Sequence, residues 1–205
     1  MSSIAHTAPG SGDRKRLARI KIEQERRSDI AERERLLDAA FGTGRFAKTS
    51  ERLREGRRPA RGLALVARWD RRLVGTLRLW PVVTGSGHAS LLLGPLAVAA
   101  DVRNLGIGGA LIWHALHKAK ALGHRAVLLV GDAAYYCRFG FSAENTDALR
   151  MPGPYEPERL LACELVPATL RGARGMIGAT FPPSARLASL LNRAACIGPP
   201  IGQPA

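Results

Sequence analysis

A chain of 205 residues with 46% hydrophobic and 23% charged residues has the composition of a globular protein with one large core. The longest nearly apolar run, residues 89–100, contains Ser90, Gly94 and Pro95 and is too short for a membrane span, which needs roughly 20 residues. The formal net charge of +14 favours anionic partners. The three cysteines lack zinc-site spacing, so we expect reduced thiols and no metal.

The N-terminus, residues 1–13, is rich in Ser, Ala and Gly and lacks the apolar block of a secretory signal. We expect a disordered tail of a cytoplasmic protein there. The folded domain is predicted over residues 14–166. Residues 167–205, rich in Gly, Ala and Pro, are expected to form a partly disordered C-terminal extension, with one helix between residues 184 and 195. A homodimer is one candidate assembly.

The first elements follow from short-range patterns. Alternation over residues 17–22 predicts a strand, and Asp29 followed by Glu32 matches a capping box at the start of a helix. The apolar face expected for that helix comprises Ile30, Leu37, Ala40 and Phe41, and Gly42 ends it. Residues 50–55 predict a second, short helix.

Residues 45–72 carry ten basic residues against three acidic ones, a net charge of +7. Nucleic acid could exploit such a patch, but Trp69 is the one aromatic residue that interleaves with its arginines after Phe46. A solvated basic surface, or steering of a polyanionic cofactor, is the favoured interpretation, and a nucleic-acid partner the weaker one.

The middle of the chain predicts strands. Residues 63–67 and 73–79 are apolar runs that predict a hairpin with a turn of four or five residues, and residues 85–87 predict the next turn. Residues 91–98 form an apolar strand interrupted by Gly94 and Pro95. A proline within a strand indicates an edge, a bulge or the end of pairing.

A glycine-rich loop follows that strand. Gly106, Gly108 and Gly109 precede a helical pattern over residues 111–122, with Gly123 as its C-cap. Glycines let backbone N–H groups approach an anion, and the helix dipole adds positive potential, so the loop predicts a phosphate site. Residues 126–130 are a strand of the buried, parallel type, which completes a βαβ unit.

The remaining elements lie after this unit. Asp132 is expected to cap a short helix over residues 133–139 that Gly140 ends. Strands are predicted around Phe141 and over residues 160–166, with a turn at residues 152–154.

Three kinds of phosphate-binding glycine loop are candidates for this segment. A P-loop is excluded because the chain has no Gly-Lys pair. A dinucleotide-binding fingerprint fits poorly, because Leu111 stands where its third small residue belongs and residues 101–105 separate the strand from the first glycine. In its favour, Asp132 could take the place of the acid that binds the ribose. The remaining pattern is R/Q-x-x-G-x-G/A, matched from Arg103 to Gly108.

This hexapeptide resembles the pyrophosphate loop of the GCN5-related N-acetyltransferases (GNAT). Residues 94–98 look like the bulged fourth strand of that family, and residues 135–141 look like its Tyr-x-x-x-Gly-Phe segment. The resemblance spans residues 14–166 and is closest to the bacterial branch of predicted small acetyltransferases. It implies an α/β (α+β) GNAT fold: a mixed, mostly antiparallel sheet of about six or seven strands, splayed between strands 4 and 5 and flanked by about four helices.

The resemblance also implies acetyl-CoA as cosubstrate and assigns residues to it. Backbone N–H groups of the loop would hold the pyrophosphate, and the bulged strand would pair with the pantetheine arm and polarise the thioester carbonyl. The loop residues are Arg103, Asn104, Leu105, Gly106, Ile107, Gly108, Gly109 and Ala110, with the Arg103 side chain a secondary assignment, and the strand residues are Leu96, Ala97 and Val98. Tyr136 stands where the family places the general acid, and a phenol is protonated at neutral pH.

The expected reaction is transfer of an acetyl group to a primary amine of a small molecule or protein, by direct attack within a ternary complex. Tyr135 is expected to pack in the core. No general base is identified. Residues 91–98 hold no carboxylate, and Asp132 is more readily a helix cap. The four histidines after residue 80 are expected to be surface groups: His88, His114, His117 and His124. A coenzyme A binding module without turnover is the alternative, and the acceptor is not specified by the sequence.

Overall fold

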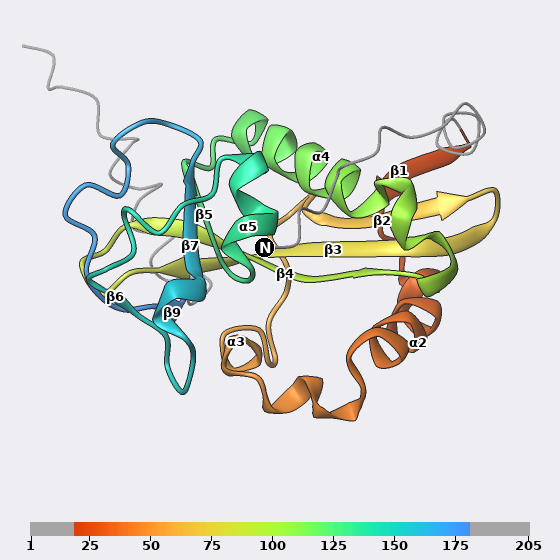
Figure 1. Cartoon of the computed structure of the whole chain (residues 1–205), viewed down its shortest axis with the longest axis horizontal. Coiled ribbons are helices and arrows are strands. Elements are labelled where there is room, and N and C mark those ends of the chain that lie inside the picture. The colour runs from red at the N-terminus through yellow and green to blue at the C-terminus, as the bar shows by residue number, and fades with distance from the viewer. Residues whose placement is uncertain (1–18, 181–205) are drawn as a thin grey trace, which may run out of the picture.

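The computed structural model describes residues 19–180 and has a mixed sheet with helices on both faces (Figure 1). The strands and helices are β1 (Ile20–Gln24), α2 (Ile30–Phe41), α3 (Thr49–Arg52), β2 (Ala64–Trp69), β3 (Arg72–Val83), β4 (Ala89–Val98), α4 (Ile107–Ala121), β5 (Ala126–Val130), α5 (Ala133–Tyr136), β6 (Leu149–Arg150), β7 (Leu160–Glu164), β8 (Gly175–Met176) and β9 (Gly178–Ala179). Within this part of the chain the main sheet has seven strands, in the order β1-β2-β3-β4-β5-β7, with β9 paired to β3. The β4–β5 pair is parallel and its neighbours are antiparallel, so the predicted fold class is confirmed.

The sheet separates two apolar layers, with α4 above it and α2 and α3 below it in Figure 1. Strand β4 shows the period of two that produces this arrangement: Leu91 and Leu93 join the cluster under α4, and Leu92 joins the cluster on the opposite face. Helix α4 contributes a continuous buried stripe to the first cluster, made of Ile107, Leu111, Ile112, Ala115, Leu116 and Ala119. Both faces of the central strands are therefore covered.

The predicted β2–β3 hairpin is present, but its turn is shorter than expected. Trp69 pairs directly with Arg72, which leaves Asp70 and Arg71 as the two turn residues. Asp70 takes a φ of +55°, a left-handed conformation that Asp tolerates better than most residues. The expectation of four or five turn residues was wrong because strand pairing continues through polar residues at this exposed end.

Helix α2 is present, but the predicted capping box is wrong. The Asp29 carboxylate accepts a hydrogen bond from the Arg26 backbone N–H at 2.9 Å and another from Arg68, and Glu32 accepts from the Leu73 backbone N–H at 3.0 Å. Burial opposes ionisation of Asp29, but these donors outweigh it and hold the pKa of its carboxyl below the usual value. Both acids thus link α2 to the sheet.

The apolar face of α2 is also narrower than the sequence predicted. Leu37 is buried, whereas Ile30 and Phe41 are 47% and 38% exposed. A buried ion-pair network occupies the rest of the contact between α2 and the sheet, in which Arg33 and Arg78 share Glu25. Charge pairing replaces part of the apolar packing here.

Residues 167–180 pack on the domain. Leu170, Ala173 and Ile177 are buried in the cluster on the face opposite α4, β8 pairs with β6, and β9 pairs with β3. The strand expected around Phe141 was wrong: Ser142 forms an isolated bridge with Ala162 of β7, and the chain then turns at residues 143–148 before a strand can continue. The tail at residues 1–13 and the helix expected between residues 184 and 195 lie outside the described residues.

Among residues 19–180, no helix is both long and apolar enough to cross a bilayer.

Candidate active site

Strands β4 and β5 separate soon after they begin to pair. Their ladder contains Leu91 with Val127 and Leu92 with Leu128, and no later pair among the described residues. The register between β3 and β4 shifts at this level, and the carbonyl of Gly94 accepts a hydrogen bond of 2.6 Å from the Trp80 indole N–H on β3. The predicted bulge at Gly94 and Pro95 is confirmed.

The separation leaves one edge of β4 open. Residues 96–98 pair with β3 on one side, and in the described part of the chain they have no strand partner on the side of β5. Ala97 is buried, and Leu96 and Val98 are half-buried. Backbone groups along this edge can therefore pair with an extended ligand.

The glycine loop lies beside this edge. A 3₁₀ turn (Ala100–Leu105) leads into Gly106, whose φ of +76° is left-handed and favours glycine. The Leu105 and Ile107 side chains are buried and anchor the loop from both sides of Gly106. A Cβ added to Gly108 would stand 3.7 Å from Val98 Cγ2, so the start of α4 and the end of β4 are neighbours.

The first turn of α4 provides free backbone donors. Ala110 N–H donates to the Gly106 carbonyl at 3.0 Å, while helix geometry gives the amides before it no partner within the helix. These amides add to the positive end of the helix dipole. Arg103 and Asn104 are exposed next to the loop, and the Arg103 Nε–H lies 3.5 Å from the Val98 carbonyl, at the limit of a hydrogen bond.

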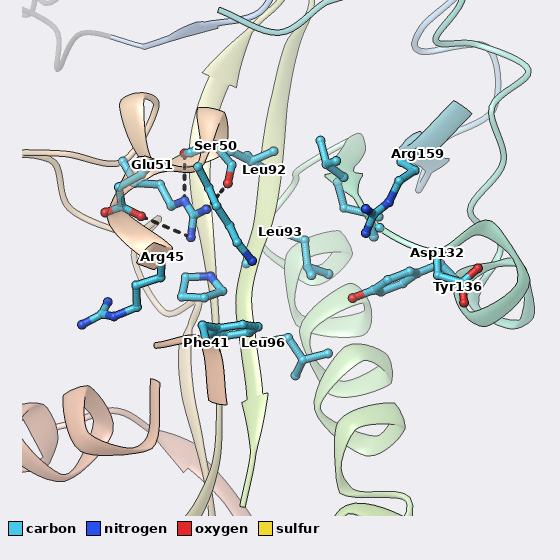
Figure 2. A pocket seen from close by; sticks show the side chains of 17 residues that line it. Phe41, Arg45, Ser50, Glu51, Leu92, Leu93, Leu96, Asp132, Tyr136 and Arg159 are labelled. Carbon is cyan, nitrogen blue, oxygen red and sulfur yellow. Dashed lines mark hydrogen bonds and ion pairs between the residues drawn. The ribbon is translucent and has the colours of Figure 1, made fainter. Parts of the chain in front are cut away.

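Tyr136 lies across the separation from β4. The Asp132 carboxylate accepts a hydrogen bond of 3.0 Å from Ala134 N–H, which confirms the predicted cap and fixes the start of α5. The Tyr136 ring meets the Phe141 ring edge to face at 5.9 Å between centroids, and its hydroxyl points into the pocket (Figure 2). Burial, with smaller contributions from Tyr135 and Asp132, raises the pKa of Tyr136 to about 12, so the phenol keeps its proton.

Gly131 makes room for this ring. A Cβ at Gly131 would lie 2.9 Å from Tyr136 Cδ2 and closer still to Cε2, a distance that real Cβ atoms do not show. The Gly131 N–H also donates to the Arg159 carbonyl at 2.9 Å. Sequence reasoning missed Gly131, although a glycine between a buried strand and a capping aspartate was a usable signal.

Tyr135 points in a different direction from Tyr136. Its ring packs against Tyr136 and Phe139, with centroid distances of 5.0 and 5.6 Å. Its hydroxyl lies 3.2 Å from the place a Cβ on Gly108 would take, so it reaches the glycine loop. The expected core packing of Tyr135 therefore holds for its ring, whereas its hydroxyl lies next to the glycine loop.

The pocket between the separated strands has a volume of about 270 Å³. Its walls come from the end of α2, residues 45–54, the bulged part of β4, the end of β5, α5 and Arg159. Figure 2 shows Phe41, Arg45 and Glu51 on one side and Tyr136, Asp132 and Arg159 on the other. The site joins segments that are far apart in the sequence.

Four of the nine arginines in residues 45–72, which were expected to form a solvated basic surface, have acidic partners within the described part of the chain: Arg45, Arg54, Arg68 and Arg72. Arg45 pairs with Glu34 and with Asp38, the latter at 2.9 Å, and Arg68 pairs with Asp29. Arg54 and Lys48, from the same stretch, line the pocket. No pattern in the sequence indicated that these two side chains line a pocket.

The histidines lie elsewhere. His88 is half-buried in the 84–88 turn, where its Nδ1 lies 2.9 Å from the Ser86 hydroxyl. His114 and His117 are exposed on α4, His124 is half-buried after it, and none of the four lines the pocket. Across residues 19–180 no three His, Cys, Asp or Glu side chains meet as a metal site, and Cys137 and Cys163 are free thiols.

Comparison with known proteins identifies this arrangement. The family model of the acetyltransferase (GNAT) family matches residues 29–141. The chain belongs to the GNAT family of acetyltransferases. Among its GNAT relatives is YjhQ of Escherichia coli K12, named an uncharacterized N-acetyltransferase, which is 31% identical over 157 residues that cover 71% of this chain and 86% of the relative.

Two solved GNAT structures resemble the fold. The N-acetyltransferase YhbS of Escherichia coli, solved in complex with CoA, aligns with a TM-score of 0.69 and 28% identity over 85% of this chain and 93% of that one. A GNAT acetyltransferase of Brucella melitensis, solved with acetyl-CoA, gives a TM-score of 0.53 and 31% identity over 70% of this chain and 94% of that one. The resemblance predicted from the loop, the bulge and the Tyr-x-x-x-Gly-Phe segment is confirmed.

Proposed function

We propose that this GNAT chain transfers the acetyl group of acetyl-CoA to a primary amine, by direct attack in a ternary complex. The observation that carries the proposal is the separation of β4 from β5, because it frees a strand edge that runs beside the α4 N-terminus and opens the pocket that the Tyr136 hydroxyl enters. The complexes of the two relatives with CoA and acetyl-CoA support the choice of cosubstrate.

Coenzyme A would bind through backbone groups. The amides of residues 105–110 take the pyrophosphate, with Arg103 and Asn104 beside it, and residues 96–98 pair with the pantetheine arm. The buried side chains of Leu105 and Ile107 support this assignment, because they leave only the backbone of those residues available to a ligand.

The chemistry then needs few groups. The neutral amine attacks the thioester carbonyl, and a backbone N–H of the bulged strand stabilises the oxyanion as the C–N bond forms. When the intermediate collapses, the C–S bond breaks and Tyr136 gives its proton to the departing sulfur. Solvent takes the proton that the amine nitrogen loses and reprotonates Tyr136.

A direct test follows thioester loss in wild-type protein with acetyl-CoA and a panel of primary amines. Transfer is expected, with one acetylated amine formed for each free thiol released. Calorimetry with coenzyme A alone runs in parallel. Tight coenzyme A binding without transfer to any small amine or peptide would instead establish a binding module.

A further inference from the structure

A second cavity adjoins the pocket at Tyr136. It has a volume of about 320 Å³ and lies between residues 47–50 and residues 151–159. Lys48, Ser50, Val130 and Arg159 line both cavities, so the two meet at these residues. An acceptor molecule can extend from the Tyr136 hydroxyl through this junction and into the second cavity.

Positive groups surround the junction without full neutralisation. Lys48 has no carboxylate partner among residues 19–180, and its ammonium lies 4.7 Å from the centroid of the Phe41 ring. Arg54 is 8% exposed, and within the described part of the chain its one carboxylate contact is Glu51 at 3.7 Å. Burial lowers the pKa of Arg54, which reflects the cost of a cation in this position.

Arg159 faces these groups from the opposite wall. Figure 2 places it across the pocket from Ser50 and Glu51. Its ion pair with Glu156 is 3.2 Å long and lies between side chains that are 45% and 63% exposed, so it contributes little. An anion bound between Lys48 and Arg159 would gain two charge-assisted contacts.

The acidic groups of the two cavities have other roles. The Asp132 carboxylate caps α5 and points away from the pocket in Figure 2. Glu51 is the counter-ion of Arg54, and Glu156 is that of Arg159. These carboxylates leave Lys48 as the unpaired charge at the junction.

The second cavity is bounded by a contact that links its two walls. From α3, the Thr49 hydroxyl donates to the Pro154 carbonyl, and Arg52 Nη1 donates to the Pro152 carbonyl at 2.8 Å. A Cβ on Gly153 would stand 3.1 Å from Arg52 Nη1, so the loop fits closely against α3. This closure favours a small acceptor over a polypeptide chain that must pass through.

We propose that the acceptor is a small primary amine that carries a carboxylate or phosphate group, held between Lys48 and Arg159 while its amine reaches the thioester carbonyl near the Tyr136 hydroxyl. The inference rests on the proposed function for the fate of the amine, but the anion site itself is a property of the pocket. Arg54 supplies further positive potential from the buried wall of the pocket.

The test compares matched acceptors with and without the anionic group. One arm uses γ-aminobutyrate and 5-aminovalerate against their neutral N-methylamides, and a second uses phosphoethanolamine against ethanolamine, which separates carboxylate from phosphate. The measured quantity is the ratio of kcat/KM for the acid to that for its neutral partner. We expect a ratio of at least tenfold in one arm, equivalent to about 1.4 kcal/mol.

Variants then locate the site. Arg159→Gln and Lys48→Met are each expected to lower the ratio about tenfold. Arg58→Gln, which removes an exposed arginine that lines neither cavity, should leave the ratio within twofold of wild type. Thermal unfolding of each variant identifies any that fail to fold, and Arg159→Lys, which keeps the charge, should retain most of the preference.

Binding separates this inference from the proposed function. Calorimetry of the same acid and neutral pairs is made on protein saturated with coenzyme A, where no turnover is needed. Preference for the acid without any transfer would overturn the proposed function and support the anion site. Transfer with equal kcat/KM for acid and neutral partners, or transfer to acidic peptides in preference to the small acids, would overturn the inference.

Discussion

The two halves of the candidate active site, one for coenzyme A and one for the acceptor, are built in different ways. The half assigned to coenzyme A consists of the end of β4, the glycine loop and the start of α4, which follow one another within residues 94–110, and it offers mainly backbone groups. The acceptor half gathers residues 41–54, the end of β5 and Arg159, and it offers side chains. The coenzyme A half is therefore formed by one continuous segment, whereas the acceptor half is formed by segments that only folding brings together.

This difference predicts how each half responds to substitution. Backbone groups survive most changes of side chain, so the coenzyme A half should be sensitive mainly at glycines and at contacts that hold the backbone. The acceptor half should change in specificity or rate when a single side chain is altered. The following predictions test that contrast, beginning with the largest effect.

Tyr136→Phe removes the hydroxyl that projects into the pocket while keeping the packed ring. We expect kcat to fall about 100- to 10,000-fold, the usual contribution of a general acid, with the affinity for coenzyme A unchanged. Steady-state kinetics and calorimetry measure the two quantities. Tyr135→Phe is the matched control and should lower kcat by less than tenfold; equal rates for Tyr136→Phe and wild type would remove the hydroxyl from the mechanism.

The pH profile of wild-type protein provides an independent check on the same group. Because burial raises the pKa of Tyr136 to about 12, the acid stays protonated at every pH below that value. We expect kcat/KM to rise as the acceptor amine loses its proton and to show no descending limb between pH 7 and pH 10. A descending limb in that range that disappears in Tyr136→Phe would contradict the assignment.

Gly131→Ala alters the acceptor half without removing a functional group. Its Cβ would overlap the Tyr136 ring, so the ring must move away from its place beside β5. A displacement of about 1 Å can cost about 100-fold in rate, and we expect kcat to fall by about that factor while coenzyme A binding stays within twofold. Gly178→Ala, where a Cβ meets nothing within 4 Å, is the control; wild-type kcat in Gly131→Ala would show that the ring position is unimportant.

Trp80→Phe tests the hydrogen bond that holds the bulge of β4 at Gly94. It deletes the 2.6 Å hydrogen bond to Gly94 and leaves that buried carbonyl without its donor, which costs about 1–3 kcal/mol of unfolding free energy. Denaturant unfolding measures this loss, and KM for acetyl-CoA should rise with it. Trp113→Phe, at a residue 48% exposed on α4, should change stability by less than about 0.5 kcal/mol.

Gly106→Ala tests the coenzyme A half at the left-handed glycine of its loop. A Cβ at a φ of +76° costs about 1–2 kcal/mol, and we expect that loss in denaturant unfolding. Gly109→Ala is the comparison, because a Cβ there meets Phe139 at an ordinary 3.5 Å and the position is helical. Its stability should equal or exceed that of wild type by up to about 1 kcal/mol; an equal loss in both variants would show that φ at Gly106 does not matter.

The same contrast explains what could be predicted from the sequence. The glycine loop, the interruption at Gly94 and the cap at Asp132 were all found, because each depends on residues adjacent in the chain. Lys48 and Arg159 were missed as pocket residues, since no local pattern brings a residue before β2 next to one before β7. The capping box at Asp29 failed for the related reason that distant donors, Arg68 and the Leu73 backbone, compete for those carboxylates.

The position of β9 has a consequence for the order in which the protein folds during synthesis. This last described strand pairs with Val82 and Val83 at the end of β3, and Ile177 beside it belongs to the cluster on the face opposite α4. A nascent chain that has emerged only through β7 still exposes the apolar surface that Leu170, Ala173 and Ile177 later cover. The second layer of the core is therefore incomplete until these residues have been synthesised.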